Sequence, residues 1–411
     1  MAAGRRVVVT GTGVVCALGL NAVECWTALR EGRSGIAPIL ATDVSELRFQ
    51  SGAEVRGFRA ENHFEGTRCD LIDRFAQFAV VAARQAVCEA GLDLRARDAA
   101  ARGRMAVVTG TSMGGQTSLD RGFVAIYKEG RPRPHPFTIP LTMYNAGASQ
   151  ISMDLGITGP AFTVSTACAS ATHAIGQAYW MVRSGAVESA LCGGSEAPFS
   201  PGILRAWEAM RVVSPEACHP FSRDRRGLTL GEGGAMLMLE TLDGALARGA
   251  RVLGEVVGFG MSADAGHVTQ PSVEGPAAAM AMAMQDAGIE ATQVEYINSH
   301  GTGTQANDAT ETRAIRQVFG SHADRLAVSS TKSMHGHALG AGGAIEAFAT
   351  LMALREGVLP PTVNYTESDP ECDLDVVPNV ARQRQAGFAL SNSFAFGGLN
   401  AVLAFKRWGK D

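Results

Sequence analysis

The chain has 411 residues, of which 46% are hydrophobic and 18% are charged, and its formal net charge at pH 7 is −4. It is long enough for two or three domains or one large duplicated domain, and this apolar fraction can fill a large core. The small negative charge argues against a nucleic-acid-binding protein.

No apolar run reaches the ~18 residues that a membrane-spanning helix needs, and the first residues lead directly into a strand-like run instead of a signal peptide. None of the eight cysteines belongs to a metal-binding CxxC pair, and a chain of this length needs no disulfide framework. We therefore expect a cytoplasmic protein without membrane insertion, whose reduced thiols are mostly small buried hydrophobes.

Short valine-rich runs alternate with alanine-rich helical stretches, a pattern that favours an α/β fold with covered sheets. The expected strands are Arg6–Thr10, Met105–Thr109, Phe162–Ser165, Glu188–Cys192, Ala235–Glu240, Val252–Gly258, Val294–Asn298, Ala327–Ser330 and Ala401–Phe405. The expected helices include Arg74–Ala90, Ser170–Ser184, Gly275–Ala287 and Ala341–Arg355. Three glycines stand where helix C-caps belong, namely Gly91, Gly185 and Gly288. Residues 36–68 and 114–146 are the least regular and are expected to be surface excursions.

The first strand runs into a GTG sequence that resembles part of a dinucleotide-binding fingerprint. Gly11 and Gly13 take the first two glycine positions, but Cys16 occupies the third. No acidic residue follows ~20 residues later within a βαβ pattern. The GTG sequence is therefore a weak signal, and we do not expect nucleotide binding.

Residues 161–176, AFTVSTACASATHAIG, read as a strand, a cluster of small residues and a helix, with Cys168 at the helix start. Unpaired N–H groups and the helix dipole favour a thiolate over a thiol at such a position. The neighbours Ala167, Ala169 and Ser170 leave room for a substrate to approach the sulfur. Cys168 is therefore a candidate nucleophile, and a buried structural cysteine is the alternative.

Residues 294–311, VEYINSHGTGTQANDATE, contain a strand that ends at Asn298, a Gly/Thr loop and the start of a helix. Ligands bind at strand ends in α/β sheets. His300 in the loop can donate a hydrogen bond or exchange a proton, and Thr302 and Thr304 offer hydroxyl groups to a polar ligand. An ordinary loop histidine is the alternative.

Residues 327–347, AVSSTKSMHGHALGAGGAIEA, place Lys332, His335 and His337 between a strand end and a helix of small residues. A lysine and two histidines are costly to hold near apolar surface without a purpose. The two histidines alone are too few for a metal site. The pattern therefore predicts a polar functional cluster.

Residues 391–405, SNSFAFGGLNAVLAF, put two phenylalanines in a glycine-flanked turn before the last strand. Gly397 and Gly398 would let backbone N–H groups face a ligand. Taken alone, this segment is only a hairpin-like turn.

In the order TACAS, HGTGT, TKSMHGH and FAFGG, these four motifs resemble the β-ketoacyl-[acyl carrier protein] synthases of fatty-acid and polyketide synthesis, closest to the synthase II type. The resemblance covers essentially the whole chain. It implies a thiolase-like α/β fold of two similar halves, each a five-stranded sheet covered by helices, in a five-layered αβαβα architecture. We place the halves at residues 1–250, with the nucleophilic cysteine, and 251–411, with the His, Lys and His set.

The resemblance implies a decarboxylative Claisen condensation, in which Cys168 accepts an acyl chain and malonyl-carrier adds two carbons. His300 and His337 match the pair that stabilises the oxygen of the malonyl enolate. The backbone N–H groups of Cys168 and Phe396 match the oxyanion hole of the acyl thioester, and Phe396 matches a gating aromatic.

Other site residues are carried over in the same way. Lys332 resembles a lysine that pairs with the acid matching Glu311 and orders the site. No cofactor is required beyond the phosphopantetheine delivered on the acyl carrier protein, whose arm would meet Thr302 and Thr304. Met113 and Leu228 match positions near the acyl and malonyl pockets. Four residues match a group that holds a structural monovalent or divalent cation in some members: Asn298, Glu346, Ser391 and Asn392.

Several positions depart from the family pattern. Ala395 and Leu399 replace a glycine and a threonine of the last motif, and this bulk could stiffen the turn. Arg74 and Arg211 could meet an acidic carrier protein, but Asp70 stands where synthase II relatives tend to be basic. These departures favour a specialised synthase, like those of nodulation-factor or polyene pathways.

Three alternatives remain at the level of the sequence. The chain could be the catalytic ketosynthase subunit of a type II polyketide synthase, paired with a chain-length-factor paralogue instead of forming a homodimer. It could be a non-catalytic acyl-binding scaffold, which the complete Cys, His, Lys and His set argues against. It could be a thiolase, but the FAFGG segment lacks the second cysteine that thiolases use.

Overall fold

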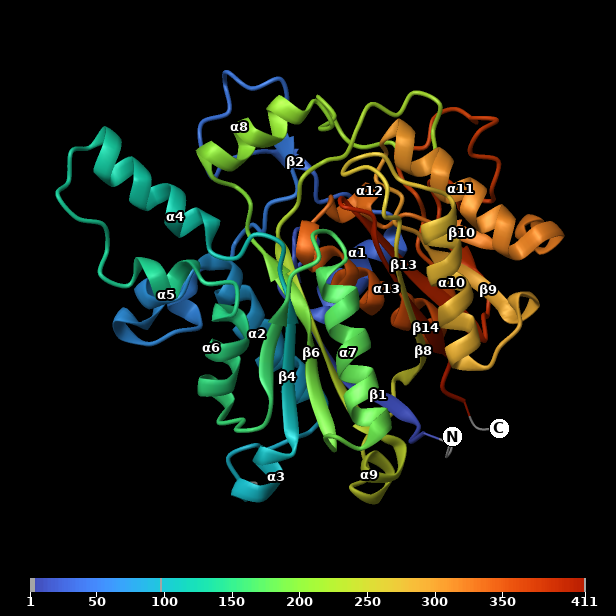
Figure 1. Cartoon of the computed structure of the whole chain (residues 1–411), viewed down its shortest axis with the longest axis horizontal. Helices are drawn as coiled ribbons and strands as arrows, with labels where there is room; N and C mark the ends of the chain where they lie inside the picture. The colour runs from blue at the N-terminus through green and yellow to red at the C-terminus, as the bar shows by residue number, and fades with distance from the viewer. Residues whose placement is uncertain (1–3, 97, 410–411) are drawn as a thin grey trace.

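A ten-stranded mixed sheet runs through the computed structural model, which describes residues 4–96 and 98–409 (Figure 1). Its strands, in sheet order, are β10 (Ala327–Ser329), β9 (Val294–Asn298), β13 (Phe388–Ala395), β14 (Leu399–Lys406), β8 (Gly254–Ala263), β1 (Val7–Cys16), β7 (Gly233–Thr241), β6 (Ser189–Glu196), β4 (Met105–Gly110) and β5 (Ala161–Val164). Two short ribbons stand apart from it, β2 (Ala37–Pro38) with β3 (Ser51–Gly52) and β11 (Val358–Leu359) with β12 (Arg382–Gln383).

The sheet consists of two halves with the same topology. In the first half, β4 pairs in parallel with β5 and β6, while β7 pairs antiparallel with β6 and β1. In the second half, β9 pairs in parallel with β10 and β13, while β14 pairs antiparallel with β13 and β8. The halves meet where β1 and β8 pair antiparallel, with Val7, Val8 and Val9 opposite Val256, Glu255 and Gly254.

Helices complete a layered arrangement around the two halves. Their bounds are α1 (Ala22–Glu31), α2 (Arg74–Glu89), α3 (Ala99–Gly103), α4 (Gln116–Phe123), α5 (Thr138–Thr142), α6 (Ala146–Leu155), α7 (Ser170–Ser184), α8 (Pro201–Met210), α9 (Leu242–Ala247), α10 (Glu274–Ala287), α11 (Gln305–Phe319), α12 (Lys332–His335) and α13 (Gly342–Glu356). Helices α7 and α13 each contact strands of both halves, whereas α2 packs on the first half and α10 on the second. The expected five-layered α/β architecture of two similar halves is confirmed.

The central position of α13 explains its sequence. Thirteen of its fifteen residues are buried, and most of them are alanine, glycine or large apolar residues. A helix that is apolar all round is stable only when it is covered on all sides. The small residues let α13 approach α7 and the strands of both halves closely, so the strand ends that precede these two helices come near each other.

Two of the three expected glycine C-caps are confirmed, whereas α2 has Ala90 as its C-cap and Gly91 follows it with φ of 66°. Gly185 and Gly288 are left-handed C-caps with φ of 80° and 65°. Residues 391–395, expected to lie in a turn, form the end of β13, and residues 114–146 contain α4, a π-helical turn over Val124–Lys128 and α5. These local patterns are ambiguous because tertiary packing, and not propensity, stabilises them. Among the described residues, no helix has both the length and the apolar character to cross a membrane.

The GTG sequence lies inside β1 and serves helix packing. A Cβ added at Gly11 would lie 2.1 Å from the carbonyl oxygen of Ala86, and one added at Gly13 would lie 1.9 Å from that of Ala82. Both carbonyls belong to α2, so only glycine allows this helix to rest directly on β1. The backbone of β1 is thereby covered by α2.

We predict that Gly13→Ala lowers the free energy of unfolding by about 1–3 kcal/mol or more, because the methyl group meets rigid backbone. Urea denaturation measures this change. Gly122→Ala in α4 is the matched control, since its nearest neighbour would be at 3.8 Å, and alanine is the better helix former. Equal stability of the two variants would contradict the packing role.

Candidate active site

Cys168 lies in the connection between β5 and α7, at the junction of the two halves. The preceding Ala167 has a left-handed backbone with φ of 48°, which turns the chain sharply before the helix starts at Ser170. The Cys168 side chain is buried, with 8% of the residue exposed. It faces a cavity shared with residues of the second half.

The structure corrects the expectation that the helix start favours a thiolate. Burial raises the pKa of the Cys168 thiol to about 11, although the Lys332 charge and the backbone N–H groups of Phe396 and Cys168 act in the opposite direction. Cys168 also precedes α7 by two residues, so it lies outside the first helical turn. Desolvation of the anion therefore outweighs the helix dipole.

The same two backbone N–H groups define where a negative charge is stabilised beside the sulfur. Phe396 lies in the turn between β13 and β14, and its N–H interacts with the Cys168 sulfur. This turn is held by hydrogen bonds from the Gly397 N–H to the Val268 carbonyl at 2.7 Å and from the Asp264 N–H to the Gly398 carbonyl at 2.9 Å. The N–H of Phe396 is thus fixed by the second half over a thiol that belongs to the first.

His300 and His337 face the same cavity from the second half. Their ring centroids are 5.4 Å apart and their planes are nearly perpendicular, at 84°. Burial first, and then the Lys332 charge, lowers the pKa of both imidazoles. At neutral pH both rings are therefore neutral and each carries one N–H that it can donate.

The cavity is narrow, about 70 Å³, and brings together the predicted site residues from both halves. Leu228 contributes to its wall, and Thr302 and Thr304 lie along it with their hydroxyl oxygens 2.9 Å apart. Thr304 also caps α11 by accepting the Asn307 N–H. Met113 lies instead in the adjacent apolar cluster, packed with residues such as Leu228.

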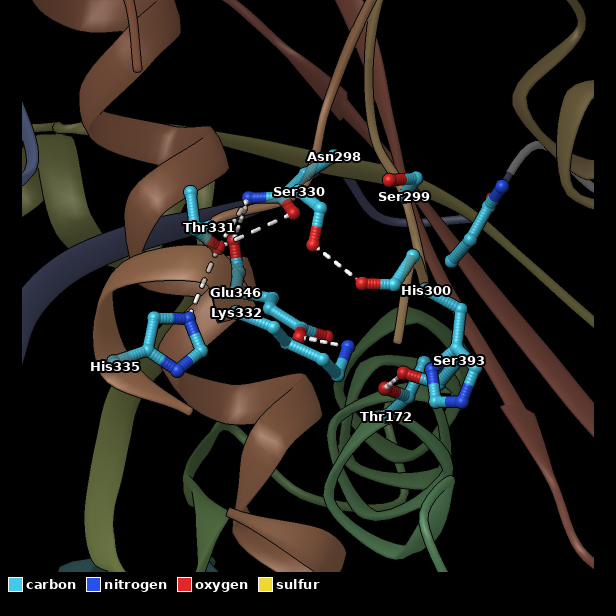
Figure 2. Close-up of polar contacts among 12 residues, drawn as sticks. Thr172, Asn298, Ser299, His300, Ser330, Thr331, Lys332, His335, Glu346 and Ser393 are labelled. Carbon is cyan, nitrogen blue, oxygen red and sulfur yellow. Dashed lines mark hydrogen bonds and ion pairs between the residues drawn. The ribbon is translucent and has the colours of Figure 1, made fainter. Parts of the chain in front are cut away.

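Lys332 pairs with Glu346, not with Glu311 as expected (Figure 2). Lys332 begins α12 and Glu346 lies in the first turns of α13, and about 1% of each side chain is exposed. Helix α13 therefore supplies the counter-charge from within the central layer. The expected Lys332–Glu311 pair is wrong because Glu311 is engaged elsewhere.

Glu311 holds the loop that carries His300. Its carboxylate accepts the N–H groups of His300 and Gly301, each at 2.8 Å, and the Asn392 side-chain N–H at 3.1 Å. Burial raises the pKa of Glu311 to about 7, against the lowering effect of these donors. Glu311 thus positions His300 through the backbone.

A buried polar chain lies behind Lys332 (Figure 2). Nε2 of His335 lies 3.0 Å from the Thr331 hydroxyl, which in turn lies near the Asn298 side chain at 3.4 Å. Asn298 donates to the Glu346 carbonyl at 3.5 Å. Burial lowers the pKa of His335 to about 3, so it contributes a neutral ring and not a charge.

The four residues expected to hold a cation are not all brought together. Asn298 and Ser391 are partners on neighbouring strands and share one face, near Glu346. Asn392 points to the opposite face, because adjacent strand residues alternate, and it bonds Glu311 there. Lys332 already neutralises Glu346. These side chains therefore do not fit a complete cation site, and no cluster of three His, Cys, Asp or Glu residues among the described positions could hold a metal.

Two residues beside the site, Glu196 and Trp207, were not expected from the sequence. Glu196, at the buried end of β6, accepts the Ser112 N–H at 2.7 Å and the Gly340 N–H at 3.0 Å, and so ties the two halves together beside Cys168. A lone acid at the end of an apolar strand was the signal for it. Trp207 of α8 lines the cavity and stacks on Phe396, and only the tertiary structure reveals this contact.

The arginines proposed for carrier contact have different surroundings. Arg74 forms a bidentate pair with the buried Glu232, with N–O distances of 2.6 and 2.9 Å, and also donates to the Val55 carbonyl. The Arg74 guanidinium is therefore engaged in the fold, with 35% of its side chain exposed, and its contact with a carrier stays a prediction. Arg211 and Asp70 are exposed, so their charges are accessible to a partner.

We predict that Glu346→Gln lowers the free energy of unfolding by about 3–5 kcal/mol, because it leaves the Lys332 ammonium buried without a counter-charge. Glu188→Gln is the matched control, since the Arg104–Glu188 pair is half-exposed on both sides, and it should cost no more than about 1 kcal/mol. Chemical denaturation compares the two. A similar loss in both variants would show that the buried pair is not special.

We also predict that alkylation of Cys168 by iodoacetamide keeps accelerating as the pH rises from 7 to 10, because the thiolate forms only near the raised pKa of about 11. Mass spectrometry of the Cys168 peptide measures the rate at each pH, and Cys168→Ala identifies the adduct. A plateau below pH 9 would show that the N–H groups and Lys332 outweigh burial.

Comparison with known proteins identifies the family. The models of the β-ketoacyl synthase N-terminal and C-terminal domains match residues 4–245 and 253–366. Nodulation protein E of Rhizobium sp. is 48% identical over 98% of this chain and 99% of its own, and 3-oxoacyl-[acyl-carrier-protein] synthase 2 of Synechocystis sp. is 43% identical over 98% of each.

Solved structures agree. The ishigamide ketosynthase/chain length factor superposes with a TM-score of 0.94 at 38% identity, covering 99% of this chain and 100% of that chain. A β-ketoacyl synthase from Burkholderia phymatum gives 0.91 at 34% identity, covering 98% and 100%. The family models, the full-length relatives and the geometry of the site all agree. The chain belongs to the β-ketoacyl synthase family, whose members are acyltransferases that catalyse condensation and have a thiolase-like fold.

Proposed function

We propose that this enzyme condenses a malonyl group, delivered on an acyl carrier protein, with an acyl chain held on Cys168. The observation that supports this most is the convergence of Cys168, His300, His337 and the Phe396 N–H on one narrow cavity between the halves. A nucleophile and two separate sets of hydrogen-bond donors are what a two-step acyl transfer and condensation needs.

In the first half-reaction, the Cys168 sulfur attacks the carbonyl carbon of an acyl-carrier thioester. The oxyanion of the tetrahedral intermediate is stabilised by the backbone N–H groups of Cys168 and Phe396. The carrier thiolate leaves and takes up the proton that Cys168 loses. Because the resting thiol is protonated, the Lys332 charge nearby assists by favouring the anion as it develops.

In the second half-reaction, the malonyl thioester loses carbon dioxide, and the electron pair of the broken C–C bond passes into an enolate. The neutral rings of His300 and His337 donate N–H groups to the enolate oxygen. The enolate carbon attacks the acyl thioester and the bond to the Cys168 sulfur breaks. The released thiolate takes up one proton from water, because the proton that it lost in the first half-reaction left with the carrier thiol. The product is a β-ketoacyl carrier two carbons longer.

The remaining site residues have supporting roles in this proposal. Burial keeps both histidines neutral and the Lys332 charge, held by Glu346, adds to this effect, while Glu311 fixes the His300 loop. Thr302 and Thr304 lie along the cavity where the phosphopantetheine arm would enter. Leu228 on the wall would border the malonyl group, and Met113 in the adjoining apolar cluster would limit the acyl chain.

The partners are proposed on the same basis. An acidic carrier would approach the exposed Arg211, and Asp70 would disfavour a carrier that suits relatives with a basic residue there. A second subunit fits the exposed apolar residues Phe123, Tyr127 and Ile139, of which 49%, 81% and 69% are exposed. We propose either a homodimer or a pair with a chain-length-factor paralogue; the latter is supported by likeness to a ketosynthase/chain length factor structure.

The pathway and the domain division complete the proposal. High identity to nodulation protein E favours a specialised acyl product over housekeeping fatty acids. Functionally, we divide the chain into residues 1–250, which carry the nucleophile, and residues 251–411, which carry the histidines and Lys332. The identical strand pairing of the two halves supports this division.

We predict that Cys168→Ala forms no acyl adduct with acyl-carrier but retains malonyl decarboxylation, since both histidines remain. His300→Ala or His337→Ala should reduce decarboxylation by roughly 10²-fold, the scale of one lost oxyanion donor. Acyl transfer to Cys168 should suffer less in these variants. Peptide mass spectrometry follows acylation, and release of carbon dioxide follows decarboxylation.

His322→Ala is the matched control, because this partly buried histidine bonds the Val294 carbonyl at the far end of β9. It should leave both half-reactions intact. A base-labile acyl adduct on Cys168→Ala, or equal losses in both half-reactions for the His300 and His337 variants, would refute the assigned roles.

A further inference from the structure

We propose that Trp207 is a positioning residue for the gate: by stacking on Phe396 it holds the turn at residues 395–398 closed over Cys168 until an acyl chain displaces the ring. The inference rests on the proposed function, in which the Phe396 backbone N–H stabilises the oxyanion beside Cys168, and on the gating role expected for the Phe396 ring. It adds a residue from the first half of the molecule that controls the order of substrates.

The stack is the first observation. The ring centroids of Trp207 and Phe396 lie 6.3 Å apart, with an angle of 27° between the planes. Both rings line the cavity that contains Cys168. Offset-stacked aromatic rings at this separation attract each other beyond their burial. The closed turn therefore gains a contact that it loses when the Phe396 ring swings away.

Trp207 is held in place independently of the gate. It lies on α8, at the top of the molecule in Figure 1. The ring packs against the apolar cluster that includes Leu204 and Leu228. Its neighbours in the helix are anchored as well: the Glu208 carboxylate accepts the Arg48 N–H at 2.6 Å, and Arg205 pairs with Glu46 at 2.7 Å. The indole is thus a fixed platform on the first half.

The gate itself is tied to the second half by its backbone. Gly397 and Asp264 make the hydrogen bonds that hold the turn, and a Cβ at Gly398 would come within 2.5 Å of the Asp264 Cβ. Those contacts fix the backbone of the turn but not the Phe396 ring. The ring is half-buried and lines the cavity. The position of the Phe396 ring therefore depends on its stack with Trp207. A shift of the ring that also moves the Phe396 backbone would move the N–H group that faces the Cys168 sulfur.

The clamp has a consequence for the reaction order. While the ring covers the thiol, the free enzyme is protected from reagents and from malonyl-carrier. An acyl chain on Cys168 occupies cavity space beside Trp207 and competes with the stack. Loss of one aromatic pair should change the closed-to-open ratio by about two- to tenfold.

The test measures access to the thiol. Cys168 of the whole enzyme is alkylated with iodoacetamide at fixed pH, and the peptide adduct is followed by mass spectrometry. We expect Trp207→Ala to react about two- to tenfold faster than the wild type, and Trp207→Phe to react at nearly the wild-type rate because it restores an aromatic platform. Trp408→Ala removes an indole near the C-terminus, far from the cavity, and should change nothing.

A second measurement distinguishes a clamp from general support of the fold. Decarboxylation of malonyl-carrier by the enzyme without an acyl group should rise in Trp207→Ala by a similar factor, while the melting temperature of Trp207→Phe stays near that of the wild type. If Trp207→Ala does not fold, Trp207→Leu keeps apolar bulk without the stack and should show the same faster alkylation.

The outcomes separate this inference from the proposed function. Unchanged alkylation and unchanged decarboxylation in both Trp207→Ala and Trp207→Leu, together with faster alkylation in Phe396→Ala, would overturn the clamp but keep the gate. Unchanged rates in Phe396→Ala as well would overturn the gate itself. Faster alkylation in Trp207→Ala that Trp207→Phe does not reverse would also contradict the clamp, because the ring contact would then not be the cause.

Discussion

Lys332 and Glu346 face each other where the two halves meet, with about 1% of each side chain exposed. The surrounding site depends on this enclosed positive charge. Together with burial, which has the larger effect, this charge lowers the pKa of His300 and His337, and it opposes the effect of burial on the pKa of Cys168. A lone ammonium could not be held in such a place, since burying an uncompensated charge costs several kcal/mol. The carboxylate from α13 makes the arrangement possible.

Desolvation in this buried site affects catalysis in two opposite ways. It keeps the histidines neutral, which suits hydrogen-bond donation to an enolate, and it keeps the Cys168 thiol protonated, which does not by itself suit nucleophilic attack. The Phe396 N–H and the Lys332 charge compensate in part. A dry cavity with fixed donors stabilises developing charge better than water would. The disadvantage is that the Cys168 thiol, protonated at rest, becomes reactive only when a substrate is bound.

The duplicated topology explains how these groups converge. In both halves, the chain passes from the outermost strand to a central helix: β5 leads to Cys168 and α7, and β10 leads to Lys332, His337 and α13. The two central helices contact the strands of both halves. Residues more than a hundred positions apart are thereby placed at one junction. The Trp207–Phe396 stack crosses the same junction and joins α8 of the first half to the turn between β13 and β14 of the second.

Much of the site was readable from the sequence. The motifs around Cys168, His300, Lys332 and Phe396 are local patterns at strand ends, and the resemblance they carry identified the family and its fold. The glycines after α7 and α10 predicted helix ends, because a left-handed residue is needed there and glycine adopts it without steric cost.

Other features were decided only by tertiary packing. The partner of Lys332 is Glu346 and not Glu311, because two acids at similar sequence distances are distinguished only by where α11 and α13 lie. The high pKa of Cys168 follows from burial that no local pattern reports. Arg74 reads as a surface cation, but packing commits it to Glu232. Local sequence determines which groups are available at each strand end; the distances between them, and hence their charge states, arise only when the two halves close on each other.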